Sequence, residues 1–144
     1  MSVIFAPRDL TCELKQKLLA TGNGSNLSDE ELVLLYNTFG DLIMKALAIV
    51  ENGSITLERS KSQHQVFRVE SNSGGLNYCS NYTRYCRCFN TVQKYIAPVY
   101  ELWCEHTLAI YLAEIMGKIR VVHLTDEALS RSMEMLYMQD TTTT

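Results

Sequence analysis

The sequence predicts a small α+β domain built around a metal site, and three observations carry this prediction. In the first third of the chain, apolar residues recur every three or four positions, as on one face of a helix. After the turn dipeptide Asn52-Gly53 the period changes to two, which is typical of strands. Further along, cysteines and a histidine follow one another in the order of metal ligands. We therefore expect N-terminal helices, a small three-stranded antiparallel sheet, a zinc-binding motif and C-terminal helices.

Length and charge limit the class of protein. A chain of 144 residues is long enough for one ordinary domain and short for two. Its apolar runs are too short to span a bilayer, so we expect a soluble protein. The formal net charge is −3, which argues against a general phosphate binder.

Two helical regions are expected before the strands. Residues 7–20 carry leucines at helical spacing, with a proline in the first turn. The second region begins at a capping box, Ser28 with Glu31 three positions later, and its apolar series continues to Val50. Gly40-Asp41 interrupts the series, so one long helix and two collinear helices both fit.

Three short antiparallel strands should follow. In the first, Ile55 and Leu57 alternate with Thr56 and Glu58, the period of two that indicates a strand. Two further runs, residues 66–69 and 76–80, each follow a polar or glycine-rich turn and share the apolar character of strands.

The last third of the chain should be mostly helical. An apolar run from Leu108 to Met116 predicts one helix body, and Thr125 is a good N-cap for a final helix to about Met138. Methionines off the core side of that final helix fit either core packing or a docking surface. A short helix that ends near Pro98 is expected within residues 89–103. The tail, residues 139–144, should be disordered.

The most informative pattern is Cys86-x-Cys88 followed, after fifteen residues, by Cys104-x-His106. Three thiolates and one imidazole fill a tetrahedral zinc shell and leave no position open for a substrate. Positions two apart on a helix diverge by about 200°. We therefore expect the second pair to lie at the N-terminus of a helix, where the backbone is only partly helical.

Other interpretations of the cysteines remain open. They could be small buried apolar residues, or parts of a secreted disulfide framework. Five cysteines would leave one unpaired, and the start of the chain lacks a basic segment followed by a long apolar stretch, which favours a reducing intracellular compartment. Cys79 fits either a fifth ligand or a residue of the strand core, and the full tetrahedral shell favours the core. Cys12, His64 and His123 lack a nearby ligand set.

A basic and aromatic group of residues surrounds the first half of the motif. Such a group could bind single-stranded nucleic acid, form a solvated rim, or anchor a protein partner. The residues are Arg59, Lys61, Arg68, Arg84 and Arg87, interleaved with Tyr78, Tyr82 and Tyr85. No phosphate-binding loop and no other catalytic set is apparent in the sequence, so we expect no enzymatic activity.

The motif resembles the SWIM zinc finger, and Ala109, three positions after the histidine, fits the alanine of the form found in recombination proteins. The likeness extends over residues 28–138 and looks like the SWIM-domain subunit of Shu-type recombination complexes, the Sws family. This division leaves residues 1–27 as an N-terminal helical extension and places the zinc finger at residues 79–112. Ala109 can equally be an ordinary small core residue.

The resemblance implies a non-catalytic adaptor that binds Zn²⁺ through Cys86, Cys88, Cys104 and His106. Members of the family pair with a RecA-family recombinase paralogue, and the heterodimer supports recombinase filaments on single-stranded DNA. The expected setting is the nucleus, in DNA repair, the response to DNA damage, and meiosis. Two alternatives stay open: a stand-alone SWIM nucleic-acid-binding module of the transposase-related type, and an interaction domain of a ubiquitin or signalling pathway.

Overall fold

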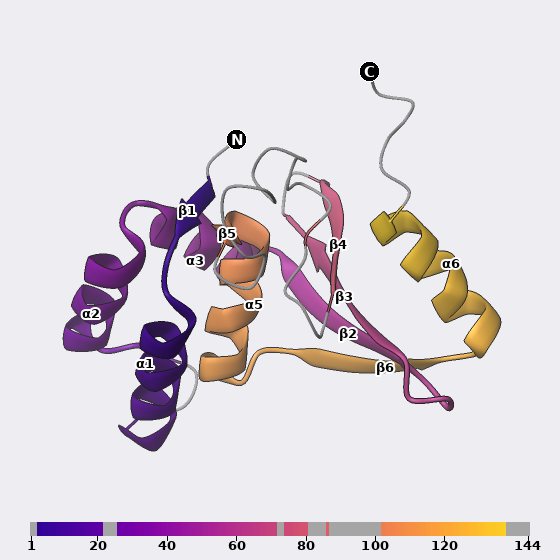
Figure 1. The fold of residues 1–144 in the computed structure, drawn as a ribbon, viewed down its shortest axis with the longest axis horizontal. Helices are drawn as coiled ribbons and strands as arrows, with labels where there is room; N and C mark the ends of the chain where they lie inside the picture. Colours follow the sequence, from indigo (N-terminus) through magenta and orange to yellow (C-terminus); the bar gives the residue numbers. More distant parts are fainter. Residues whose placement is uncertain (1–2, 22–25, 72–73, 81–85, 87–101, 138–144) are drawn as a thin grey trace.

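The computed structural model describes residues 3–21, 26–71, 74–80, 86 and 102–137. Figure 1 shows a helical half beside a twisted sheet, with one further helix on the far side of the sheet. The elements in chain order are β1 (Val3–Phe5), α1 (Arg8–Thr21), α2 (Asp29–Phe39), α3 (Leu42–Asn52), β2 (Ser54–Ser60), β3 (Gln65–Glu70), β4 (Leu76–Ser80), β5 (Leu102–Cys104), α5 (Glu105–Met116), β6 (Arg120–Leu124) and α6 (Asp126–Tyr137).

The predicted α+β class is confirmed, and the predicted helices that fall within the described residues are present. The Ser28 hydroxyl accepts from the Glu31 amide at 3.2 Å, and the Glu31 carboxylate accepts from the Ser28 amide at 2.8 Å, so the capping box forms as expected. The apolar series divides into the two helices α2 and α3. Gly40 ends α2 with a φ of 68°, a conformation that glycine adopts without steric cost.

The main sheet has four strands in the order β4-β3-β2-β6. The three antiparallel strands β4, β3 and β2 match the prediction, and β6 adds a fourth strand that lies parallel to β2. The sequence did not reveal β6, because it is short and has no regular alternation. A second, two-stranded sheet pairs β1 with β5, which brings the start of the chain beside Cys104.

Polar and apolar residues alternate along β2, and both kinds are buried. Thr56 and Glu58 are only 0% and 4% exposed. Figure 1 shows why: α6 lies on one side of the sheet, while α5 and the helical half lie on the other. Thr125 caps α6 as predicted, since its hydroxyl accepts from the Ala128 amide at 3.1 Å. Both faces of β2 are therefore covered.

An aromatic cluster holds the helical half together. Phe39, Trp103 and Tyr111 meet edge to face, with ring centroids 5.1 to 5.3 Å apart. The Tyr111 hydroxyl donates to the carbonyl of Thr11, and the Trp103 indole donates to the carbonyl of Ala6. Residues 3–21 thus pack into the same core as α5. The strand that ends at Cys104 is held by its pairing with β1 and by the ring contacts and hydrogen bond of Trp103.

Two expectations concern parts of the chain that the structure does not describe. The predicted helix before Pro98 falls within the undescribed residues 87–101, and the predicted tail, residues 139–144, falls within the undescribed residues 138–144. The last two of the fifteen residues between Cys88 and Cys104, Leu102 and Trp103, are described and belong to the strand β5. Among the described residues, no helix is both long and apolar enough to cross a membrane.

Candidate metal centre

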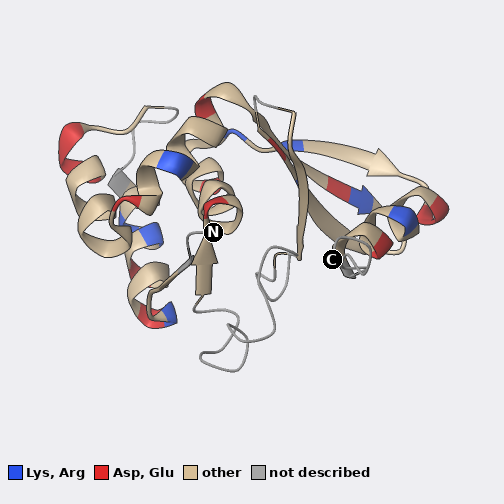
Figure 2. Cartoon of the chain, turned by 90° about the horizontal axis from the view of Figure 1, so that it is seen from above, with Lys and Arg blue, Asp and Glu red and all other residues tan. Residues whose placement is uncertain are grey.

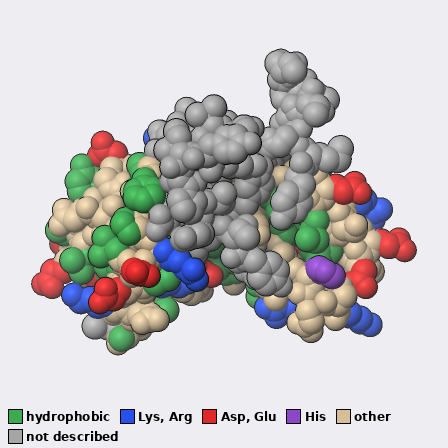
Figure 3. All heavy atoms as spheres, viewed as in Figure 1, with side chains coloured by type: hydrophobic (Ala, Val, Ile, Leu, Met, Phe, Trp, Pro, Cys, Tyr) green, Lys and Arg blue, Asp and Glu red, His purple; other side chains and the backbone are tan. Residues whose placement is uncertain are grey.

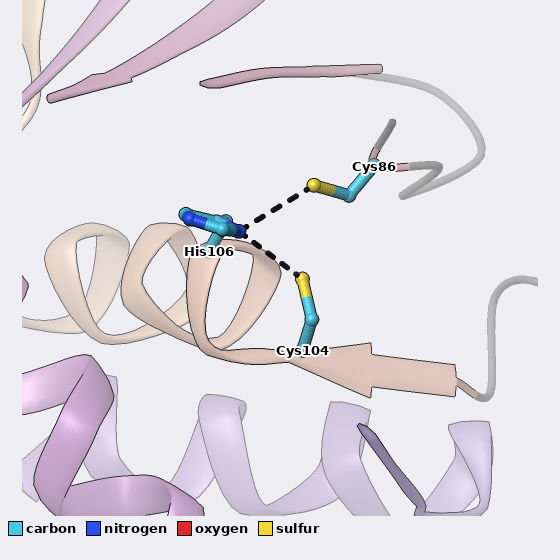
Figure 4. A group of neighbouring side chains, drawn as sticks. All are labelled: Cys86, Cys104 and His106. Carbon is cyan, nitrogen blue, oxygen red and sulfur yellow. Dashed lines mark hydrogen bonds between the residues drawn. The ribbon is translucent and has the colours of Figure 1, made fainter. Parts of the chain in front are cut away.

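Three of the four predicted ligands come together between β4 and the start of α5 (Figure 4). Cys86 forms an isolated antiparallel bridge with Cys79 at the edge of the main sheet. Cys104 is the last residue of β5, and His106 lies in the first turn of α5. Cys88, the fourth predicted ligand, lies outside the described residues.

The start of α5 explains how two ligands only two positions apart face one point. Cys104 is the N-cap, with an extended backbone (φ −111°, ψ 177°), while His106 is already helical. The Cys104 amide donates to the Thr107 hydroxyl at 3.0 Å, and the Thr107 amide donates to the Cys104 sulfur at 3.4 Å. The prediction that this pair lies at a helix N-terminus is confirmed. The positive end of the helix dipole also favours a thiolate at this position.

The distances fit a metal ion. His106 Nδ1 lies 3.7 Å from the Cys86 sulfur and 3.8 Å from the Cys104 sulfur, and all three ligand atoms lie within 4.8 Å of one another. A tetrahedral zinc shell with Zn–S of about 2.3 Å and Zn–N of about 2.05 Å would separate sulfur and nitrogen by about 3.6 Å. The ring presents Nδ1, rather than Nε2, to the sulfurs. The donor set and its spacing therefore fit zinc.

The ligand side chains are largely buried, and hydrogen bonds hold them in place. Cys86 and Cys104 are fully buried, and His106 is partly exposed. Behind the ligands, the side chain of Asn77 in β4 reaches two of them at once: its Nδ2 lies 3.3 Å from His106 Nε2, and its Oδ1 lies 3.6 Å from the Cys86 sulfur. The ligand atoms are thus held from the sheet as well as from the helix.

The structure separates the remaining candidates from this cluster. Cys79 is buried in the strand core and is not one of the three clustered ligands. Cys12 is exposed on α1, and His64 and His123 are exposed, as expected for surface histidines. Ala109 is fully buried in α5, one turn after His106.

The described members of the basic and aromatic group do not all lie on one face. The strand register places Arg59 and Arg68 on opposite faces of the sheet. Arg68 contacts two carboxylates, Glu58 at 3.5 Å and Glu70 at 3.6 Å, and Tyr78 is buried. The other proposed members, Tyr82, Arg84, Tyr85 and Arg87, lie outside the described residues.

Charges of both signs are mixed over the described surface. Figure 2 shows basic and acidic residues interspersed along the helices and the sheet, and Figure 3 shows them side by side on one face. Neither view shows a continuous basic stripe among the coloured residues, of the kind that tracks a nucleic-acid backbone.

Two residues at the centre were not found by sequence reasoning. Thr107 had a readable signal, because a polar residue three positions after an N-cap completes a capping box, here with a cysteine as the cap. Asn77 had none. It is nine positions before Cys86, and only the pairing of Cys79 with Cys86 brings it beside the ligands.

Comparison with known proteins gives a consistent set of relatives. The chain is 30% identical to mouse (Mus musculus) zinc finger SWIM domain-containing protein 7 over 128 residues, which are 89% of this chain and 82% of the relative. The human (Homo sapiens) protein of the same name is 28% identical over 81% of this chain and 84% of its own length. A homolog of that protein in Dictyostelium discoideum is 26% identical over 76% of this chain and 72% of its own length.

Two further comparisons found nothing. No protein-family model matches the chain, and no solved structure matches it.

Proposed function

Because the chain belongs to the family of zinc finger SWIM domain-containing protein 7, we propose that it is a zinc-binding adaptor of a Shu-type complex. In this proposal it has no catalytic activity of its own. It pairs with a RecA-family recombinase paralogue in the nucleus, supports recombinase filaments on single-stranded DNA, and so promotes homologous recombination and DNA repair, including in meiosis.

The observation that carries the proposal is the spacing of Cys86, Cys104 and His106. Thiolates with an imidazole in a tetrahedral arrangement suit zinc, whereas magnesium and calcium prefer oxygen ligands. We propose Cys88 as the fourth ligand, because it completes the motif that this family is named for. Four protein ligands would close the shell, which agrees with a structural role.

Zinc would act here through stability and geometry. Cys86 belongs to the edge of the main sheet, and Cys104 and His106 belong to the start of α5. A shared ion would join these parts, and its binding free energy would become folding free energy. The surface shown to a partner would then depend on the metal, although no ligand need touch the partner.

The described surface offers apolar side chains for such a partner. Val33 and Tyr36 on α2 and Met44 on α3 are 56%, 48% and 61% exposed. Figure 3 shows green side chains gathered over the helical half of the molecule. Exposed tyrosine and methionine are residue types that protein interfaces favour.

A comparison of three tagged proteins tests the adaptor proposal. The wild type, Cys104→Ser and Cys12→Ser are captured from cells, and the proteins and nucleic acid that come with each are identified by mass spectrometry and sequencing. Cys12 is exposed on α1 and away from the metal cluster, so Cys12→Ser is the matched control. We expect a RecA-family paralogue with the wild type and the control, reduced at least tenfold with Cys104→Ser.

One outcome would contradict the adaptor, and a second would contradict its dependence on the metal. Nucleic acid captured without any recombination protein would favour the stand-alone SWIM module. For that module, log K should fall by about 0.7 per phosphate contact for each log unit of salt. Equal capture of the paralogue by wild type and Cys104→Ser would instead show that the metal centre has no part in partner binding.

A further inference from the structure

We propose that Asn77 is a positioning residue of the metal centre, whose side-chain amide holds Cys86 and His106 in place for the ion. In this inference the amide selects the ring nitrogen of His106 that binds the ion and stabilises the thiolate of Cys86. The inference rests on the proposed metal site and adds to it a residue outside the Cys-x-Cys and Cys-x-His motif.

The strand geometry places Asn77 where it can do this. Cys86 is paired with Cys79 in an antiparallel bridge, and Asn77 is two positions before Cys79 on β4. Side chains two apart on a strand share a face, so Asn77 is a diagonal neighbour of Cys86. From the other side, the first turn of α5 brings His106 to the same amide.

Each group of the Asn77 amide lies beside one ligand. Asn77 Oδ1 is 3.6 Å from the Cys86 sulfur, and Asn77 Nδ2 is 3.3 Å from His106 Nε2. Because Asn77 contacts His106 at Nε2, Nδ1 is the ring nitrogen that faces the sulfurs of Cys86 and Cys104. This contact therefore favours Nδ1 as the nitrogen offered to the ion.

A bound metal would set what each ligand needs from this amide. With Nδ1 on the ion, the neutral imidazole would carry its proton on Nε2 and need an acceptor. A Cys86 thiolate has no proton and can only accept. An amide offers one acceptor and one donor, so the single side chain of Asn77 would satisfy both ligands in one of its two orientations.

Few side chains could serve both ligands. An amide carries a donor and an acceptor of nearly equal size, so exchanging the two groups leaves the van der Waals contacts of the side chain unchanged. Aspartate offers only acceptors, and one of its oxygens would repel the thiolate. Leucine has nearly the same size and offers neither group, so these two substitutions separate the two hydrogen bonds.

The test compares full-length wild type, Asn77→Leu and Asn77→Asp. Zinc affinity is measured by competition with a chelating dye, and cobalt(II) reports the thiolate ligands through its sulfur-to-metal charge-transfer absorption. Nitrogen-15 NMR of the imidazole reads which ring nitrogen of His106 carries the proton. Asn37→Leu and Asn37→Asp, at an exposed position on α2, are the matched controls.

We expect Asn77→Leu to weaken zinc binding by about 10- to 100-fold, the usual effect of removing a partner that orients a ligand. Asn77→Asp should keep the Nε2 proton through its carboxylate, yet also lose affinity and shift the cobalt–sulfur band. The wild type with zinc should show His106 protonated at Nε2. The Asn37 controls should match the wild type.

Some results would contradict the role of Asn77 alone, and another would contradict the metal site as well. If the wild type binds zinc and both Asn77 variants bind within about twofold of it, Asn77 is only a polar residue of β4. A zinc-bound His106 protonated at Nδ1 would also refute it. A wild type that binds neither zinc nor cobalt would overturn the metal site and the role of Asn77 together. Unfolding of the metal-free proteins shows whether any loss of affinity comes from misfolding.

Discussion

Cys104 performs two tasks at a single position. Its sulfur accepts the Thr107 amide and so caps α5, and the same sulfur lies 3.8 Å from His106 Nδ1. Serine or threonine usually fills an N-cap, because an oxygen there satisfies an unpaired helix amide. A thiolate does the same and adds a soft metal ligand. The metal pair and the helix start are therefore one local structure.

Ala109 tests how tightly α5 packs behind the ligands. It is fully buried, one turn after His106. We expect Ala109→Thr to lower the free energy of unfolding by about 1–3 kcal/mol, since extra atoms in a close-packed site force side chains or backbone to move. Displacement of His106 should also speed zinc loss to a chelator and weaken partner capture.

The control for Ala109→Thr is Ala48→Thr, the same change at an exposed position of α3. If Ala109 is only a small core residue, Ala109→Thr will lower the free energy of unfolding by the same amount with and without zinc. Zinc affinity will then stay as in the wild type. Thermal unfolding with and without zinc, together with chelator competition, distinguishes these outcomes.

At the scale of elements, β2 is the strand whose polar residues are least expected to be buried. Its alternating Thr56 and Glu58 suggest a wet face, yet α6 covers them. Glu58 is partly compensated by Arg68, with 3.5 Å between the charged groups. Among the described residues, Glu58 Oε1 and Arg68 Nε have no hydrogen-bond partner. The face of the sheet that α6 covers thus contains buried polar groups.

The buried polar groups beneath α6 lead to a prediction at the scale of this element. Arg68→Met should leave the Glu58 carboxylate buried beneath α6 without its cation, and lower the free energy of unfolding by about 1–3 kcal/mol. The lower end is the better expectation, because the Arg68 side chain is 30% exposed and solvent screens it. Urea unfolding of the variant gives the value.

The double variant Glu58→Leu with Arg68→Met is the informative partner experiment. Replacing both charges by apolar groups should recover much of the lost stability, because the desolvation cost disappears with the charges. Lys61→Met, at an exposed position beside the β2–β3 turn, is the control and should change little. If the double variant recovers none of the stability lost in Arg68→Met and stays well below the wild type, the ion pair is a net stabilising contact.

At the scale of the molecule, the metal cluster lies where the main sheet meets the helical half. Cys86 joins from the sheet edge, while Cys104 and His106 join from the β5–α5 junction that the aromatic cluster anchors. The described core is continuous between the two halves, so the fold does not depend on the metal alone. We expect the metal to add stability to a fold that already has a core.

Removing the metal tests this expectation. Free zinc at about 100 times its dissociation constant should stabilise the folded chain by about 2.7 kcal/mol and raise the melting temperature. A chelator should reverse the shift, and magnesium should not reproduce it. Cys104→Ser should melt at one temperature with or without zinc. Equal melting of the wild type in zinc and in chelator would contradict a structural metal.

Local rules were enough for much of the fold. The capping box at Ser28, the N-cap at Thr125 and the helix start at Cys104 each depend on residues within one turn, and each forms as the sequence predicts. The antiparallel strands β2, β3 and β4 are neighbours in the chain, so their pairing also follows from short connections. The candidate ligands were readable for the same reason, because each pair is only two positions apart.

The sequence by itself therefore determined the α+β class, the helices and the order of the metal ligands. Only the tertiary structure decided that β6 pairs in parallel with β2, that α6 covers the polar face of β2, and that Asn77 stands behind Cys86 and His106. These features join residues that are far apart in the chain. No local period, cap or turn encodes such contacts, because they depend on which faces remain to be covered once the local elements have formed.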